Sequence, residues 1–350
     1  MRFHLIDSLR GIAAIWVVLF HIRGGFHIDN LAVYLPKIVT TILFGIGNSG
    51  VPIFFVISGF VITHSLNHDK VNINYLAKFT LRRSVRLDPA YWGSILLVIF
   101  LAWISSVIKN EQIVWSTSKT IIAHFFYAQD LLELTSIGRV YWTLCLEIQF
   151  YLIFCILIAI TQYFEKYYKN TNFLIFLGVA IISILWPLGL VKQNLYPGLF
   201  FPHWYGFLLG VFAYWSWKKK LPTLFFYIYT IPILIVAILT HSKFGIAAGL
   251  TAIFVLEASK LGHISSMNWK WLQFLGMISY SLYLTHNPIA GASFFIIYKL
   301  IGNSVIAQLL ALIIVVIICI TFAFLFWWLF EKWSIKLSKS ICVHNPKINN

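Results

Sequence analysis

The sequence predicts an all-α protein, a polytopic membrane helix bundle of about ten transmembrane helices with both termini in the cytoplasm. Of the 350 residues, 60% are hydrophobic and only 11% are charged, and the mean hydropathy is +0.84. Soluble domains carry about 25% charged residues, so this composition is typical of a chain that crosses a membrane many times. Apolar runs recur along the whole chain, which leaves no room for a separate soluble domain.

A helix needs about 20 apolar residues to cross the roughly 30 Å of hydrocarbon in a bilayer. Ten segments approach or meet this length, and the eighth is the shortest. The predicted spans are residues 9–26, 48–66, 89–108, 140–161, 172–190, 198–217, 221–240, 244–259, 271–298 and 303–330. Residues 1–335 are therefore predicted to form a membrane-embedded domain, and residues 336–350 a short cytoplasmic tail.

One further apolar stretch, IIAHFFYAQDLLEL at residues 121–134, is interrupted by Gln129, Asp130 and Glu133. A charge at the centre of a membrane helix costs about 2.5–3.5 kcal/mol on the mildest insertion scale. We expect this stretch to be interfacial or re-entrant rather than an eleventh span.

Lysine and arginine are unevenly distributed between the loops that these spans define. With the N-terminus inside, the cytoplasmic segments carry 18 of the 26 Lys and Arg residues, and the outer segments carry 8. This asymmetry agrees with the positive-inside rule and supports both the count and the orientation of the spans. The net charge of +15 is thus explained by topology and by attraction to anionic lipid headgroups, and no nucleic-acid-binding motif accompanies it.

The four cysteines indicate neither a disulfide nor a metal site. Cys145, Cys155 and Cys319 lie in predicted spans, Cys342 lies in the tail, and no pair has CxxC spacing. We expect no metal ion and no resident cofactor.

The first span carries two ionisable residues, Arg10 at its entry and His21 eleven residues later. Eleven residues make three helical turns plus about 20°, so both side chains lie on one face, roughly 16 Å apart along the axis. Ala14 and Val17 lie between them and are small enough to leave a passage. The spacing permits an anion held at Arg10 while His21 acts deeper in the membrane.

Four polar side chains on different spans are predicted to share one depth. They are His21, Ser58, Glu147 and His286. Counting about 1.5 Å per residue from the ends of the predicted spans places all four in the outer half of the hydrocarbon layer. That convergence is expected of a site rather than of scattered polar residues.

Packing is the competing explanation for each of these residues. A membrane histidine is more often hydrogen-bonded to its neighbours than catalytic, and Ser58-Gly59 is a common small-residue helix contact. Glu147 is harder to explain in this way, because an acid without a partner in an apolar span is very costly.

Five stretches, taken together, resemble acyltransferase family 3, integral-membrane O-acyltransferases of surface sugars and related acceptors. In the family's order they are IDSLRGIAAIWVVLFH with Arg10 and His21, VPIFFVISGFVIT with Ser58, RRSVRLDPAYW with Arg83 and Arg86, YWTLCLEIQFYL with Trp142 and Glu147, and LGMISYSLYLTHNPI with His286. The resemblance covers residues 5 to 331. One departure lies in FPHWYGFLLG, where we expect an arginine before Phe-x-x-Gly and His203 is the nearest candidate.

The resemblance implies transfer of an acyl group, with acetyl expected first, from cytoplasmic acyl-CoA to a hydroxyl of a cell-envelope or exported glycan, free or lipid-linked. The enzyme would lie in a bacterial cytoplasmic membrane. Arg10, Arg83 and Arg86 would bind the phosphates of CoA, because guanidinium groups form bidentate forks on phosphate. His21 would act as general base on the acceptor hydroxyl, since imidazole titrates near the working pH. Glu147 would orient or stabilise that imidazole, or hold the acceptor.

Supporting roles are expected for four more residues. His286 or a polar group near Ser58 would assist the tetrahedral oxyanion. Trp142 would stack on a sugar or belong to an interfacial aromatic belt, and His203 would replace the missing arginine. Direct transfer and a covalent acyl-serine at Ser58 are both open, since a buried serine needs an adjacent base that the sequence does not place.

Two other classes of function fit the same features. A transporter or flippase for a lipid-linked sugar or small anion would also have ten spans and intramembrane charges. A structural partner in an envelope-polymer assembly complex would be equally apolar. Arg10, His21 and Glu147 all stand at their motif positions, which argues against a degenerate site.

Overall fold

The computed structural model describes residues 3–66, 71–112, 115–192 and 198–341, and every regular element within these ranges is helical. A helix of at least 14 residues overlaps each of the ten predicted spans. These helices are α1 (His4–Gly24), α4 (Gly50–Leu66), α5 (Ile73–Lys109), α7 (Trp142–Phe164), α8 (Thr171–Ile184), α9 (Trp204–Trp217), α10 (Thr223–Leu239), α11 (Lys243–Lys260), α12 (Lys270–Ile301) and α13 (Val305–Phe326). The predicted all-helical bundle is confirmed.

Length and apolarity identify an integral membrane protein. Among the described residues, five segments are long and apolar enough to cross a membrane: His4–Gly24, Lys37–Leu66, Ile73–Lys109, Trp142–Phe164 and Val305–Ser340. Helices such as α9, with 14 residues, are shorter than a span requires on its own. Ten spans and two cytoplasmic termini therefore stay predictions.

The other elements are short. They are α2 (Asp29–Tyr34), α3 (Lys37–Val39), η1 (Thr40–Gly45), η2 (Gly47–Ser49), α6 (Ser118–Phe125), η3 (Phe201–His203), η4 (His263–Ser265), η5 (Trp327–Glu331) and α14 (Lys332–Ser340). In the stretch expected to be interfacial or re-entrant, residues 121–125 belong to α6 and the residues after them form turns. Helix α6 is too short to cross a membrane. Helix α14 continues through the expected domain boundary at residue 335, and Cys342 lies outside the described residues.

Helix α5 joins the basic motif and the third predicted span into one rigid element. Asn72 caps its start by accepting a hydrogen bond from the Tyr75 backbone N–H at 2.8 Å. At its other end Asn110 adopts a left-handed conformation with φ of 54°. The predicted span began only at residue 89, because hydropathy detects the apolar part of a helix and not its polar beginning. Arg83 and Arg86 therefore project from the same helix that enters the membrane.

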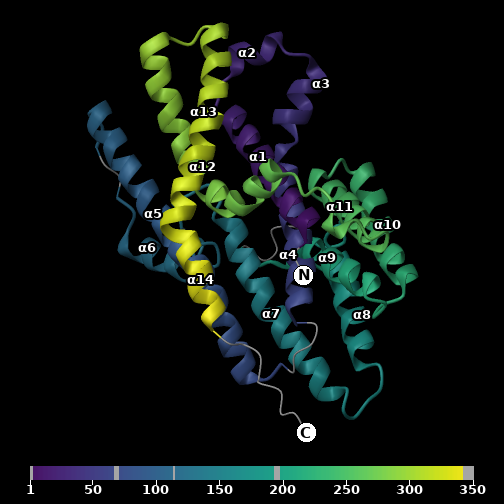
Figure 1. The fold of residues 1–350 in the computed structure, drawn as a ribbon. Coiled ribbons are helices and arrows are strands. Elements are labelled where there is room, and N and C mark those ends of the chain that lie inside the picture. Colours follow the sequence, from purple (N-terminus) through teal and green to yellow (C-terminus); the bar gives the residue numbers. More distant parts are fainter. Residues whose placement is uncertain (1–2, 67–70, 113–114, 193–197, 342–350) are drawn as a thin grey trace.

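The helices that carry the candidate site meet around α1, which lies near the centre of the molecule (Figure 1). Helix α12 packs along α1, and α13 packs on α12. Helix α4 packs on α1 from another side and joins it to the group formed by α9, α10 and α11. Helix α5 contacts α7, α12 and α14. Segments far apart in the sequence are thereby brought to a common interior.

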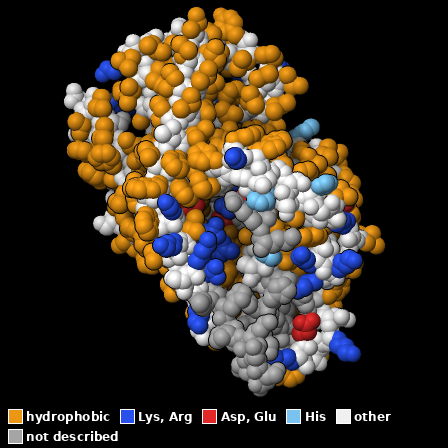
Figure 2. Space-filling model, viewed as in Figure 1, with side chains coloured by type: hydrophobic (Ala, Val, Ile, Leu, Met, Phe, Trp, Pro, Cys, Tyr) orange, Lys and Arg blue, Asp and Glu red, His pale blue; other side chains and the backbone are white. Residues whose placement is uncertain are grey.

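Charge is unevenly distributed over the surface. Figure 2 shows hydrophobic side chains covering most of the upper part of one face, whereas most Lys and Arg side chains gather in its lower half beside a hollow. An uneven distribution of Lys and Arg is what the positive-inside rule describes, and the orientation of the spans stays a prediction.

Helices α4 and α9 cross in close contact at two glycines. A Cβ atom on Gly59 would lie 2.0 Å from the carbonyl oxygen of Phe207, and one on Gly210 would lie 1.9 Å from that of Val56. Small residues at such crossings let membrane helices approach each other closely. Gly59 is therefore a packing residue, while its neighbour Ser58 faces a cavity.

We expect Gly59→Ala to lower the free energy of unfolding by about 1–3 kcal/mol, because the added methyl group overpacks the crossing. Gly178→Ala on α8 is the matched control, since a Cβ there meets no atom within 4 Å. The control should be neutral or slightly stabilising, because alanine is the better helix former. Thermal unfolding of the purified proteins in detergent measures both changes, and an unchanged Tm for Gly59→Ala would contradict the close crossing.

Candidate functional site

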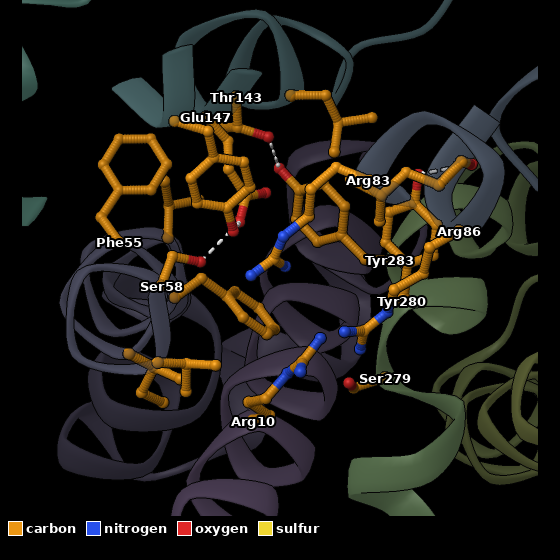
Figure 3. Close-up of a pocket in the computed structure, with 17 residues that line it drawn as sticks. Arg10, Phe55, Ser58, Arg83, Arg86, Thr143, Glu147, Ser279, Tyr280 and Tyr283 are labelled. Carbon is orange, nitrogen blue, oxygen red and sulfur yellow. Dashed lines mark hydrogen bonds between the residues drawn. The ribbon is translucent and has the colours of Figure 1, made fainter. Parts of the chain in front are cut away.

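A cavity of about 770 Å³, counted with its open mouth, lies where α1, α4, α5, α7 and α12 meet. It brings together five of the predicted site residues from four of these helices: Arg10, Ser58, Arg83, Arg86 and Glu147. Figure 3 shows their side chains directed toward the same space. The cavity is open to solvent at one side, so a ligand can reach these groups without unfolding the bundle.

Positive charge dominates this cavity. Three of its lining residues are arginines, and among the described lining residues Glu147 is the only acid. In the part of the chain that the structure describes, no carboxylate forms an ion pair with Arg10, Arg83 or Arg86. The guanidinium forks are therefore available to an anion, and phosphate matches their bidentate geometry.

Glu147 is held by two hydroxyl groups. Ser58 Oγ donates a hydrogen bond to Glu147 Oε1 at 2.5 Å, and the Tyr151 hydroxyl donates to the same oxygen. Hydrogen bonds to an ionised acceptor are about twice as strong as neutral ones. These donors are the partners that an acid in an apolar span requires, and Tyr151 is one that the sequence analysis did not identify.

Aromatic rings support one of the guanidinium groups. The Arg83 guanidinium carbon lies 4.8 Å from the centre of the Tyr151 ring and 5.4 Å from that of Phe79. Cation–π contacts of this kind contribute about 0.5–2 kcal/mol. The same tyrosine thus contacts Arg83 through its ring and Glu147 through its hydroxyl.

A second acid beside the arginines was missed by the sequence analysis. Glu331 is 5% exposed and accepts a hydrogen bond from Ser281 Oγ at 2.7 Å. It interacts electrostatically with Arg86 and Arg10. The π-helical turn η5 ends at this residue, and such turns are frequent at functional sites. The one available signal was a single acid at the end of the run FLFWWLFEKW.

His21 and His286 form a separate pair. Their Nδ1 and Nε2 atoms lie 3.1 Å apart, and the ring centres lie 5.0 Å apart. Neither histidine lines the arginine cavity. Helices α1 and α12 thus bring these two residues together, whereas Glu147 lies against Ser58 rather than against His21.

Tyr283 stands between the cavity and the histidine pair. It lines the cavity, and its hydroxyl lies 2.8 Å from Thr143 Oγ1 (Figure 3). Its ring centre lies 6.1 Å from that of His286, which follows it after nearly one turn of α12.

The four polar residues predicted to share one depth lie at two different levels along α1, with Ser58 and Glu147 at one level and His21 and His286 at the other. A Cβ atom on Gly50, the first residue of α4, would meet Ala13 and Val17 in the middle of α1, and Phe60 packs on Phe3 near the start of α1. Ser58 lies roughly 12 Å beyond Gly50 along α4, toward the Arg10 end of α1. The depth count assumed that every span starts at one plane, whereas α4 starts halfway along its neighbour.

Trp142 and His203 lie together in an aromatic cluster. Their ring centres are 5.6 Å apart, and Phe55 and Phe244 flank His203 at 6.3 and 4.9 Å. Of these four residues only Phe55 lines the cavity. His203 therefore does not occupy the place of a further cavity arginine.

Metal ligation finds no support in the described residues. They contain no group of three His, Cys, Asp or Glu side chains that could hold a metal ion. Cys145, Cys155 and Cys319 are buried as free thiols.

Comparison with known proteins gives one family and several relatives. The family model of acyltransferase family 3, described as "Acyltransferase domain", matches residues 3–328. The chain is 27% identical over 331 residues to "Peptidoglycan O-acetyltransferase OatA" of Listeria monocytogenes, covering 81% of this chain and 49% of that protein. It is 24% identical over 344 residues to "Putative peptidoglycan O-acetyltransferase YrhL" of Bacillus subtilis, covering 81% and 48%. The chain thus spans about half the length of these relatives, and no solved structure matches it significantly.

We expect Ser58→Ala and Tyr151→Phe each to lower the free energy of unfolding by about 1–3 kcal/mol, because each removes a hydrogen bond to the charged Glu147. The double variant should differ from the sum of the single variants by about 0.5–3 kcal/mol, since both act on one oxygen. Ser65→Ala is the control, because that hydroxyl bonds only to the Ile62 carbonyl of its own helix. Chemical unfolding in detergent measures the cycle, and strictly additive effects would contradict a shared acceptor.

Proposed function

Because the chain belongs to acyltransferase family 3 and is an O-acyltransferase, we propose that it transfers an acetyl group from acetyl-CoA to a hydroxyl of a cell-wall glycan. The reaction would cross a bacterial cytoplasmic membrane, with the donor inside and the acceptor outside. The convergence of Arg10, Arg83 and Arg86 in one open cavity carries the proposal of an acyl-CoA donor. The names of the two relatives suggest peptidoglycan as the acceptor, and they favour an acyltransferase over a transporter.

The cavity suits the phosphate groups of CoA. Three guanidiniums and one carboxyl group line it, so cationic groups outnumber acidic ones around the cavity. Each charge-assisted hydrogen bond to phosphate contributes about 1.5–3 kcal/mol. The arginines come from α1 and α5, so an anion bound between them would also join these helices.

The distance between the arginines and His21 suits the shape of the donor. Arg10 and His21 lie on one face of α1, roughly 16 Å apart along the axis. In acyl-CoA a long pantetheine arm separates the thioester from the phosphates. We propose that a donor held by its phosphates at Arg10 extends past Tyr283 and presents its thioester near His21.

His21 would act as the general base. Its imidazole takes the proton of the acceptor hydroxyl while that oxygen attacks the thioester carbonyl. The tetrahedral intermediate then breaks its C–S bond, the new ester is released, and the CoA thiolate receives the proton from His21. No other reactant is required.

Glu147 would act in the donor cavity rather than on the imidazole. Its hydrogen-bond partners are Ser58 and Tyr151, and its charge offsets one of the three arginines. The carboxylate also gives Ser58 the adjacent base that a serine nucleophile needs. Direct transfer is the simpler path, because Ser58 and His21 lie on different levels of α1 and an acyl-serine would have to move between them.

We expect Arg83→Lys and Arg86→Lys each to weaken acetyl-CoA binding about 10–100-fold, because lysine keeps the charge and loses the bidentate fork. Arg82→Lys is the matched control, since Arg82 lies on the same helix and does not line the cavity. Calorimetric titration with acetyl-CoA gives the Kd of each variant. Equal affinities for all three variants would contradict donor binding in this cavity.

We expect His21→Gln to lower kcat for transfer from acetyl-CoA about 10²–10⁴-fold, which is the contribution of general base catalysis. The Kd for acetyl-CoA should stay near the wild-type value, because His21 does not line the arginine cavity. Radiolabelled acetyl-CoA with N-acetylglucosamine oligomers as acceptors measures the transfer. Wild-type transfer by a correctly inserted His21→Gln protein would show that the base is another group.

A further inference from the structure

Backbone carbonyls fix the proton positions of the histidine pair. His286 Nδ1 lies 3.0 Å from the carbonyl oxygen of Leu282, one turn earlier on α12. A carbonyl oxygen only accepts hydrogen bonds, so Nδ1 of His286 must carry the proton. In the neutral imidazole Nε2 then has a free lone pair and acts as an acceptor.

The same argument applies to His21. Its Nδ1 lies 3.0 Å from the carbonyl oxygen of Val17 and 3.1 Å from Nε2 of His286. Both neighbours are acceptors, so His21 must carry its proton on Nδ1 and share it between them. Nε2 of His21 is left unprotonated, which is the form that a general base requires.

We propose that His286 is a positioning residue that holds His21 as the Nδ1–H tautomer and accepts part of its charge during acyl transfer. This inference rests on the proposed role of His21 as general base. His286 itself would touch neither the donor nor the acceptor, because it is 0% exposed and does not line the cavity.

The proton movements are balanced. When Nε2 of His21 takes the acceptor proton, the ring becomes a cation with protons on both nitrogens. The Nδ1 proton can then shift toward Nε2 of His286, which spreads the charge over two rings. It returns when the proton on Nε2 of His21 passes to the CoA thiolate, and both histidines are again neutral.

The arrangement excludes the role that the sequence suggested for His286. In the neutral pair its Nδ1–H is used by Leu282, and its Nε2 has no proton to donate. An oxyanion needs hydrogen-bond donors. His286 therefore cannot stabilise the tetrahedral intermediate while it serves as the acceptor of His21.

The neighbours of the pair are compatible with this assignment. On α12 the Tyr283 ring lies 6.1 Å from His286, and from α13 the Cys319 thiol contacts the His286 backbone carbonyl. Around His21 lie the Phe20 ring and the charge of Arg139. Among the described residues no acid forms an ion pair with either imidazole. The two histidines therefore depend on each other and on the two carbonyls.

Nitrogen-15 spectra of the histidine-labelled full chain in detergent test the tautomer without any activity. Signals of His21 and His286 are assigned by their loss in His21→Gln and His286→Gln. We expect a protonated Nδ1 and an unprotonated Nε2 for both residues in the neutral wild-type protein. A protonated Nε2 on His21 would overturn the inference.

Activity variants test the positioning role. His286→Phe keeps a flat ring and removes the nitrogen that accepts the hydrogen bond from His21. We expect kcat to fall about 10–100-fold, which is the typical cost of losing the hydrogen-bond partner of a functional histidine. The KM for acetyl-CoA should stay unchanged. His286→Gln can place its amide oxygen near the position of Nε2 and should recover most of the activity. Thr285→Val is the control, because it is buried beside His286 and its hydroxyl bonds only within α12.

The results for His286 and for His21 test different claims, namely the positioning role and the proposed general base. Wild-type kcat in His286→Phe, or a His286→Gln variant as slow as His286→Phe, would overturn the positioning role. If His286→Phe fails to fold, the positioning role is still tested by the tautomer of the wild-type protein and by the activity of His286→Gln relative to wild type. Activity in His21→Gln would instead contradict the proposed base and leave the measured tautomer as it stands.

Discussion

Three like-charged guanidinium groups held close together inside an apolar bundle are the constraint on which the site depends. Their mutual repulsion grows as the surrounding dielectric constant falls, and a charge within a membrane helix is costly on its own. The protein offsets this with the carboxylates of Glu147 and Glu331, with aromatic rings around Arg83, and with a cavity that admits solvent. Each carboxylate is in turn held by hydroxyl donors, from Ser58 and Tyr151 in one case and from Ser281 in the other. A bound anion would complete this balance.

This arrangement divides the interior into two places with different chemistry. At one end of α1 an electropositive cavity suits phosphate, and toward the other end two imidazoles each lie within hydrogen-bond distance of a backbone carbonyl. Tyr283 and Thr143 lie between them. A substrate that is bound at one place and reacts at the other must be long and extended, and acyl-CoA has that shape. In the proposed reaction, this separation would place the reacting group away from the side on which the donor binds.

The close crossings of the helices make this division possible. Helix α4 crosses α9 at Gly59 and Gly210, and α1 approaches α12 so closely that a Cβ atom on Gly276 would lie 2.2 Å from the carbonyl oxygen of Asp7. Backbones this close leave no room for side chains at the crossing. Ser58 lies next to the crossing at Gly59, and its side chain lines the cavity.

Much of the architecture follows from local pattern. Apolar runs marked every long helix, because hydropathy and length are local properties, and the spacing of Arg10 and His21 on one face follows from the helical repeat alone. The motifs also identified the three arginines and the one acid that line the cavity. The residue at which α5 begins was missed because the first part of the helix is polar. Glu331 was missed because an acid at the end of a span can equally well lie at the surface.

The sequence by itself determined the helical class, the charge asymmetry and the identity of the ionisable groups within the bundle. Only the tertiary structure decided which of those groups meet. Glu147 pairs with Ser58 and Tyr151, and His21 pairs with His286, because α4 starts halfway along α1 while α12 runs beside it from end to end. Such offsets depend on how helices pack against one another, and no local pattern within a single span records them.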